Sequence, residues 1–360
     1  MPLSKRLRQT MSWSLPLFAA LVTWVGLFGL AGHSIWLVAQ MEQTGRARER
    51  QLWASLPPLI PEQLHSIQLL RQNRLLSRAT SLSFSESGRY LAAGSDAAEV
   101  IIFDTAIGRR AAWFAGKGFV LDVAFSRDES LLASAESNGS IRLFGLAEGR
   151  LLNAWQGHAT AVSALAFSPQ EDWLASASTD ATIKIWNWQQ ATPEHVYTLP
   201  APVSALAVHP EGRLMAAGAD NGQVWLWRIW EQEPFCRLQH AGGVADLEFQ
   251  PARTALYVGG SHSISVWNVE TCAEIESLYT PGQEAVSEIS LSPNGRLLVA
   301  AGGVWRQPSL WIWQLPEKTL LLTGSLPPGA EAIRDVLFDP DGRVFITASH
   351  DALLRWWGVK

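Results

Sequence analysis

The chain has 360 residues, of which 48% are hydrophobic and only 17% are charged, so it can bury a large core. Its formal net charge is −5 at pH 7, which argues against a nucleic-acid-binding protein because such proteins present a strongly basic surface. The 18 tryptophans are far above ordinary usage, and this excess requires a structural explanation.

The N-terminal region contains a long apolar segment. No Asp, Glu, Lys or Arg occurs between Gln9 and Met41, and residues 15–38 are almost entirely apolar. A helix of this length measures about 36 Å at 1.5 Å per residue, and the hydrocarbon core of a bilayer is about 30 Å thick. A cleaved signal peptide has a shorter apolar region of about 7–15 residues. The sequence therefore predicts an uncleaved transmembrane helix that contacts the lipid bilayer through residues 15–38.

The orientation of this anchor follows from the flanking charges. Three basic residues precede the segment (Lys5, Arg6 and Arg8) and three follow it (Arg46, Arg48 and Arg50). The uninterrupted basic cluster on the N-terminal side favours a cytoplasmic N-terminus. The rest of the chain is then expected in a bacterial periplasm or in a lumen, with the cytoplasmic side as the alternative. We divide the chain into a tail and helix (1–41), a linker (42–65) and a folded domain (66–360).

Seven repeats follow the linker. Each has an alternating run, a short turn, an apolar run, a second turn and a final run that ends in an aromatic residue. The residues just before the first turn lie 41 to 47 positions apart, and they are Phe84, Phe125, Phe167, Val208, Phe249, Leu291 and Phe338. A period of about 40–45 residues with four short strands is typical of a propeller blade. The sequence predicts an all-β, seven-bladed propeller.

The third repeat is the most regular, with Gly157-His158 followed by the run LASASTDATIKIWN. This pattern resembles the WD-repeat family. The resemblance implies a buried hydrogen-bonded chain formed by His158, Ser178, Asp180 and Trp186. It also implies a binding scaffold, which is expected to be non-catalytic.

Closure of the ring can be predicted from where the seventh repeat stops. The chain ends three residues after Trp357, so the last blade has no fourth strand of its own. A strand-like run at Ser66–Gln72 precedes the first blade and can complete the last one. Such pairing leaves no free sheet edge at the joint.

Two groups of residues are candidates for partner binding. The sixth repeat carries extra residues at Gly302–Ser309, and this insertion includes Trp305 and Arg306, both of types that are enriched at binding hot spots. Trp188 and Trp230 follow the third strands of two neighbouring blades, so they are expected to lie together on the opposite face. Local packing of these side chains is the alternative interpretation.

Other chemistry is less well supported. Ser178, His158 and Asp180 could suggest a hydrolase, but the sequence has no GxSxG elbow. The two cysteines, Cys236 and Cys272, lack CxxC spacing and are too few for a disulfide framework, so we expect two separate thiols in neighbouring blades.

Four recurrent acids are predicted near the propeller axis, and they could bind a cation there: Asp122, Asp246, Glu288 and Asp335. The leading hypothesis is a membrane-anchored, non-catalytic scaffold without a cofactor, acting as an accessory or assembly subunit of a membrane complex. Its partners would be other proteins and the bilayer, and no nucleic acid. The alternative is a propeller enzyme or a small-ligand or cation binder that uses the central channel.

Overall fold

The structure, a computed structural model, describes residues 51, 53, 55–170, 172–251, 254–261 and 263–359. The predicted membrane segment, residues 15–38, lies outside the described residues. Within the described part of the chain, no helix combines the length and the apolar character needed to cross a bilayer. The compact unit that carries the fold begins at Leu56.

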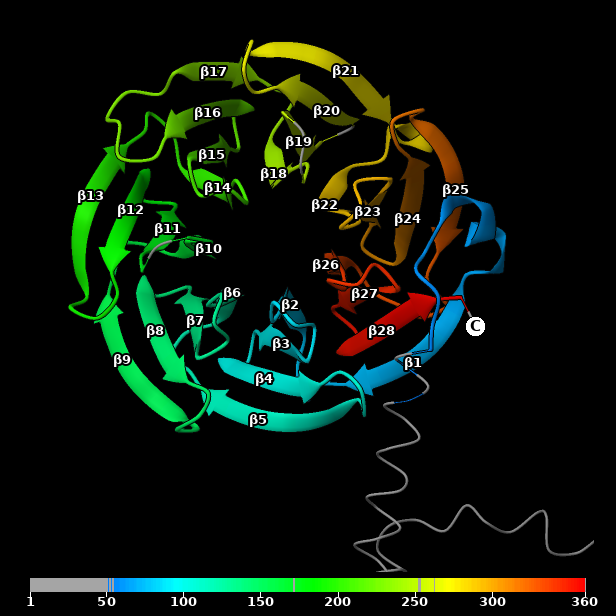
Figure 1. Cartoon of the computed structure of the whole chain (residues 1–360), viewed down its shortest axis with the longest axis horizontal. Coiled ribbons are helices and arrows are strands. Elements are labelled where there is room, and N and C mark those ends of the chain that lie inside the picture. Colours follow the sequence, from blue (N-terminus) through cyan, green and yellow to red (C-terminus); the bar gives the residue numbers. More distant parts are fainter. Residues whose placement is uncertain are drawn as a thin grey trace, which may run out of the picture. The chain divides into compact units, whose positions relative to one another are not determined.

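The described residues form seven four-stranded antiparallel sheets that are arranged as a ring of blades (Figure 1). We number the blades 1 to 7 and call their strands a to d from the centre outward. Blade 1 contains β2 (Ala79–Phe84), β3 (Tyr90–Ser95), β4 (Glu99–Asp104) and β5 (Arg109–Ala115); blade 2 contains β6 (Val120–Phe125), β7 (Leu131–Glu136), β8 (Ser140–Gly145) and β9 (Arg150–Gln156). Blade 3 contains β10 (Val162–Phe167), β11 (Leu174–Ser178), β12 (Thr182–Asn187) and β13 (Thr192–Thr198); blade 4 contains β14 (Val203–Val208), β15 (Leu214–Ala219), β16 (Gln223–Arg228) and β17 (Cys236–Gln239).

The remaining blades complete the ring. Blade 5 contains β18 (Val244–Phe249), β19 (Ala255–Gly260), β20 (Ser263–Asn268) and β21 (Ala273–Tyr279); blade 6 contains β22 (Val286–Leu291), β23 (Leu297–Val304), β24 (Gln307–Gln314) and β25 (Thr319–Ser325). Blade 7 contains β26 (Ile333–Phe338), β27 (Val344–Ser349), β28 (Leu353–Gly358) and β1 (Gln68–Arg74). The described residues also form two short 3-10 helices, η1 (Pro61–Ser66) and η2 (Pro281–Gln283). The prediction of an all-β, seven-bladed propeller is confirmed.

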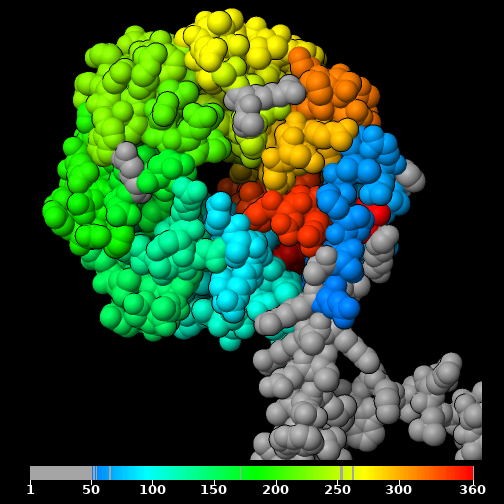
Figure 2. Space-filling view, in the orientation of Figure 1, coloured from blue at the N-terminus to red at the C-terminus, as the bar shows by residue number. Residues whose placement is uncertain are grey.

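The ring has two distinct faces. We call the face formed by the b–c turns and the connections between blades the top face, and the face formed by the a–b and c–d turns the bottom face. The a–b turns on the bottom face contain glycines with positive φ, such as Gly212 (φ 70°) and Gly342 (φ 66°), and this conformation favours glycine because it has no Cβ. Figure 2 looks onto the bottom face, which is hollowed at the centre of the ring.

The core lies between neighbouring blades and not in one central mass. Strand b is buried along its whole length, as in β11 and β19, whereas outer strands such as β25 alternate between exposed and half-buried residues. Aromatic side chains of strand c fill the gaps between sheets, and Trp311 and Trp356 are almost fully buried. Burying a large apolar side chain contributes about 1.5–3 kcal/mol, which accounts for part of the tryptophan excess.

The N-terminal strand closes the ring. β1 pairs antiparallel with β28, from Gln68 opposite Gly358 to Arg74 opposite Leu353. The observed strand starts two residues later than the predicted run, because Pro61–Ser66 form η1. Asn73 strengthens the joint, since its side chain accepts a hydrogen bond from Trp356 Nε1 (2.8 Å) and donates one to the carbonyl of Gly108 in blade 1 (2.6 Å).

The folded domain begins before the predicted boundary at residue 66. Leu59 and Leu64 are 1% and 2% exposed and belong to the core between blades 6 and 7. The Leu59 N–H also donates to the carbonyl of Gly342 in an a–b turn (2.7 Å). Figure 2 shows this blue segment lying across the bottom face. Residues 56–65 are therefore part of the propeller unit and not of a free linker, because their leucines are buried in its core.

Candidate functional site

The polar chain of blade 3 connects the top face with the core. His158 Nδ1 lies 3.1 Å from Asp180 Oδ2, and His158 Nε2 lies 2.7 Å from Ser176 Oγ. Trp186 Nε1 donates to the same Ser176 hydroxyl (2.7 Å). Ser176, and not Ser178, thus occupies the position between the histidine and the tryptophan. The Ser178 hydroxyl instead donates to the carbonyl of Ala161 at the end of the strand (2.8 Å).

The error at Ser178 has a simple cause. Side chains two residues apart on a strand share one face, so Ser176 and Ser178 cannot be distinguished by alternation. The Ser176 side chain is fully buried, so no substrate can reach its hydroxyl. Burial lowers the pKa of His158, although nearby Asp180 opposes this effect. A neutral, buried histidine and an enclosed serine suit a structural role.

Other blades fill the same place with partly different groups. In blade 5, His240 Nδ1 lies 2.8 Å from Ser265 Oγ, which also accepts from Trp267 Nε1 (2.8 Å). In blade 7, the buried Arg355 guanidinium donates to the Ser349 hydroxyl and pairs with Asp351. The sequence pattern indicates His240, Ser349 and Asp351, but it misses Ser265, which comes from strand c, and Arg355, which replaces a histidine.

Trp305 and Arg306 form the tip of an elongated hairpin on the top face. The b and c strands of blade 6 each have eight residues, whereas those of the other blades have five or six. Trp305 is 45% exposed, and its ring contacts His350 of blade 7, with centroids 4.6 Å apart. The Arg78 guanidinium lies 5.7 Å from the same ring. The insertion therefore reaches over blade 7 to the start of blade 1, and its tryptophan is both supported and accessible.

Trp188 and Trp230 lie in different grooves of the bottom face. Trp188 lines a groove of about 440 Å³ between blades 2 and 3. Trp230 lines a groove of about 900 Å³ between blades 4 and 5. The expectation that the two rings form one patch is thus replaced by two separate sites, because each c–d turn directs its tryptophan toward a different gap.

The channel acids join neighbouring blades. Asp122 accepts a hydrogen bond from the Leu165 N–H of the next blade (2.7 Å), and Asp335 accepts one from Leu82 N–H (2.5 Å). Asp246 likewise bonds to Ile289 N–H (3.0 Å). Elsewhere serine hydroxyls make the inner link between blades, for example from Ser204 to the Val244 carbonyl (2.7 Å).

Burial dominates the ionisation of these acids. It raises the pKa of Asp122 to about 7 and that of Asp246 to about 6, and it raises the pKa values of Glu288 and Asp335 well above the usual range. Among the described residues, no three His, Cys, Asp or Glu side chains are arranged to hold a metal ion. The hydrogen bonds assign Asp122, Asp246 and Asp335 to links between inner strands.

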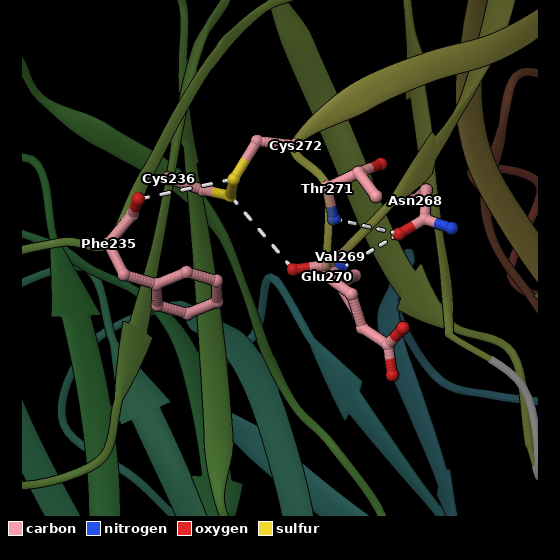
Figure 3. The surroundings of a disulfide bond; sticks show 7 residues. All are labelled: Phe235, Cys236, Asn268, Val269, Glu270, Thr271 and Cys272. Atoms are coloured by element: carbon pink, nitrogen blue, oxygen red, sulfur yellow. Dashed lines mark hydrogen bonds between the residues drawn. A yellow bond between two sulfur atoms is a disulfide. The ribbon is translucent and has the colours of Figure 1, made fainter.

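Cys236 and Cys272 form a disulfide bond (Figure 3), which corrects the expectation of two separate thiols. Their Cα atoms are 5.8 Å apart, within the range of about 4.4–6.8 Å that a disulfide requires. Cys236 opens the outer strand of blade 4, and Cys272 precedes the outer strand of blade 5. The bridge thus connects the periphery of two neighbouring blades.

Known proteins share the repeat. A family model described as "WD domain, G-beta repeat" matches residues 111–144, 149–187, 193–228 and 318–358. The chain is 26% identical over 61% of its length to apoptotic protease-activating factor 1 from Rattus norvegicus, covering 18% of that protein.

Two plant proteins are also similar over shorter stretches. Small ribosomal subunit protein RACK1z from Arabidopsis thaliana is 34% identical over 21% of the chain, covering 23% of the relative. U3 snoRNP-associated protein-like EMB2271 from the same plant is 32% identical over 33% of the chain, covering 24% of the relative. The chain thus spans about a quarter or less of the length of each of these relatives. Two of their names refer to RNA-containing particles, so the exclusion of nucleic acid rests on this chain's charge alone.

Proposed function

Because this chain is a seven-bladed WD-repeat β-propeller, we propose that it is a non-catalytic protein-interaction scaffold. Residues 15–38 anchor it in a membrane, and the Trp305 hairpin recruits a protein partner, such as another subunit of a membrane complex. The observation that carries this proposal is the accessible tryptophan at the tip of the longest hairpin of the described residues. The repeat family supports protein partners in general terms.

The surroundings of Trp305 support binding. The ring rests against His350 and beneath Arg78, so its orientation is fixed before a partner arrives. Such preorganisation reduces the entropy lost on association. Val304, Leu76 and Phe119 on the same face are 63%, 82% and 58% exposed. Exposed apolar side chains on the same face as an accessible tryptophan provide the kind of surface that partner proteins bury.

The disulfide supports the compartment part of the proposal. Disulfides persist in oxidising compartments and are rare in the cytosol. A bridge between Cys236 and Cys272 therefore favours a propeller in the periplasm or in a lumen, with the N-terminus in the cytoplasm. The disulfide and the charges that flank residues 15–38 favour the same orientation independently.

The proposal is tested by crosslinking full-length protein in native membranes, followed by quantitative mass spectrometry. The double variant Trp305→Ala and Arg306→Ala is expected to lose its main crosslinked partner, with affinity reduced by about 2 kcal/mol or more if these are hot-spot residues. Trp113→Ala is the matched control, because Trp113 on outer strand β5 is 47% exposed, close to the 45% of Trp305.

Two outcomes separate function from folding. The control variant should keep the partner, and both variants should melt like the natural protein because their side chains contribute little to the core. A folded Trp305 and Arg306 variant that retains every partner would exclude this hairpin as the binding site.

A further inference from the structure

The groove between blades 4 and 5 is the larger of the two that hold the predicted tryptophans, and it lies on the bottom face, away from Trp305. It encloses about 900 Å³ and is lined by both blades. Leu214, Ile229 and Val269 contribute apolar surface. A volume of this size is within the range of about 300–1,000 Å³ that is usual for ligand-binding sites.

The polar lining of this groove includes two arginines, Arg213 and Arg228. Arg228 is positioned by Phe235, whose ring centroid lies 4.7 Å from the guanidinium. Its ion pair with Glu231 is 3.7 Å long, and both side chains are more than half exposed, so the pair is weak and can be exchanged. Guanidinium groups bind carboxylates through two parallel hydrogen bonds, and both arginines are accessible to do so.

Trp230 forms an aromatic wall of the groove and is held in an unusual conformation. Its φ is 77°, a value that is rare for a bulky residue and is often found at functional sites. Its N–H donates to the Tyr197 hydroxyl (3.1 Å), and its ring meets Trp173 edge to face with centroids 6.2 Å apart. Even so, the side chain remains 42% exposed. Tyr197 and Trp173 belong to blade 3, and His195 of that blade also contacts the ring, with centroids 6.4 Å apart. Blade 3 therefore fixes the position of Trp230, which also lines the groove.

The disulfide connects the two walls of the groove. Cys236 lies in β17, shortly after Arg228 and Trp230, while Cys272 follows Val269 and Glu270 of blade 5. The Cys236 sulfur is also 4.0 Å from the carbonyl oxygen of Val269, as Figure 3 shows. β17 has four residues and is the shortest strand of the described propeller. A covalent link thus holds the groove where the sheet itself is weakest.

We propose that this groove binds an extended segment of a partner protein in which one carboxylate lies next to an aromatic or large apolar side chain. The carboxylate pairs with Arg213 and Arg228, and the apolar side chain packs on Trp230 and Leu214. Glu211 and Glu270 also line the groove, so they repel runs of several acids and favour a single one. The Cys236–Cys272 bridge keeps the walls at the separation that this segment requires.

The test is selection of random heptapeptides displayed on phage against the full-length protein in detergent micelles. The expected result is enrichment of peptides with one acidic residue beside an aromatic or large apolar residue. The charge-reversal variant Arg213→Glu with Arg228→Glu should lose at least tenfold in affinity for these peptides and should enrich basic ones instead. Arg296→Glu is the matched control, since Arg296 occupies the same a–b turn position in blade 6 and lies outside the groove.

Further variants assign the roles of the other groups. Trp230→Ala should weaken peptide binding, and Trp230→Phe should restore part of it if the ring packs on the ligand. Cys236→Ser with Cys272→Ser should also weaken binding while the protein remains folded. The proposal is overturned if no peptide is enriched, or if the enriched peptides bind equally well to the charge-reversal variant. Trp305→Ala should leave peptide binding unchanged, so this proposal and the proposed function can fail separately.

Discussion

Two joints of the ring are held by different means, the joint between blades 7 and 1 and the joint between blades 4 and 5. At the first, the N-terminal strand β1 completes the last blade, and Asn73 and Arg71 reach the carbonyls of Gly108 and Thr105 in blade 1. At the second, a disulfide connects the outer parts of the two blades. The first joint thus depends on hydrogen bonds and burial contributed by strand β1. The second adds a covalent bond beside a short outer strand.

The largest effect is expected from removing the strand that closes the ring. A chain that begins at Leu75 lacks β1, leaves the edge of β28 unpaired and exposes the core between blades 6 and 7. We expect a loss of about 5 kcal/mol or more, which is comparable with the whole stability of many domains. A chain that begins at Leu56 should fold as a soluble propeller. Circular dichroism and thermal melting would compare the two, and a stable chain without β1 would contradict the closing role of this strand.

An intermediate truncation measures the contribution of η1 and the residues before it. A chain that begins at Ile67 keeps β1 but loses Leu59 and Leu64, which are both buried. At about 1.5–3 kcal/mol for each leucine, the expected loss is about 3–6 kcal/mol. Equal denaturation midpoints for chains that begin at Leu56 and Ile67 would show that these leucines do not stabilise the joint.

The joint between blades 4 and 5 should be weakened less. Replacing Cys236 and Cys272 with serine is expected to reduce stability by about 2–4 kcal/mol, because the bridge restricts the unfolded chain over a separation of 36 residues. Urea denaturation of this variant and of the reduced natural protein should give similar midpoints. If reduction leaves the midpoint of the natural protein unchanged, the bridge does not hold this joint in solution.

A substitution inside one blade gives a loss of stability with which the losses at both joints can be compared. Ser176→Ala leaves the Trp186 indole N–H and the facing His158 nitrogen without their partner in the core, and a buried unpaired group costs about 1–3 kcal/mol. Ser178→Ala removes one bond at the end of a strand, so its expected cost is about 0.5–1.5 kcal/mol. Thermal melts would show which of the two variants is less stable. A Ser178→Ala variant that is less stable than Ser176→Ala would contradict the assignment of Ser176 to the polar chain.

The smallest effect is a difference in pH dependence between the two joints. Burial raises the pKa of Asp335 well above its usual value, so the protonated form is favoured in the folded state. Its contribution to stability is present below the unfolded pKa of about 4 and is lost as the pH rises through the folded pKa. Asp335→Asn should therefore reduce the loss of stability above pH 4. Ser204→Ala at the other joint should shift stability by about 1 kcal/mol at every pH.

Melting temperatures of these two variants between pH 4 and pH 8 would show whether the effect of Asp335→Asn depends on pH and that of Ser204→Ala does not. The natural protein should become less stable over this range, since the pKa of Asp246 is about 6 and that of Asp122 is about 7. A natural protein that is more stable at pH 8 than at pH 5 would show that these buried carboxyl groups do not control its acid–base behaviour.

The ring architecture could be predicted from the sequence because repeat length and alternation are local signals. The polar chain of blade 3 was predicted except for its serine, since Ser176 and Ser178 share one strand face. The disulfide was missed because the spacing of Cys236 and Cys272 resembles the repeat itself. Only the structure shows that one cysteine begins a shortened β17 while the other lies in the c–d turn of the next blade, so that their Cα atoms meet.

The boundary of the domain was misplaced for another physical reason. Three prolines and a short polar run make residues 57–66 resemble a connector, and no periodic pattern marks Leu59 and Leu64 as core residues. Their burial depends on a gap between blades 6 and 7 that exists only after the ring has formed. Local sequence patterns cannot report contacts of this kind.

The pairing of β1 with β28 also determines when the molecule can finish folding. Asn73 and Trp356, which are hydrogen-bonded across this joint, are 283 residues apart in the chain. β1 is therefore synthesised long before β28, its pairing partner. Loop closure over such distances adds little free energy, about 0.6 kcal/mol for each doubling of length, but it makes folding slow. During synthesis, β1 and the growing edge of the propeller are both unpaired strands that can aggregate. A cell that produces this protein must therefore keep β1 from aggregating until β28 has been synthesised.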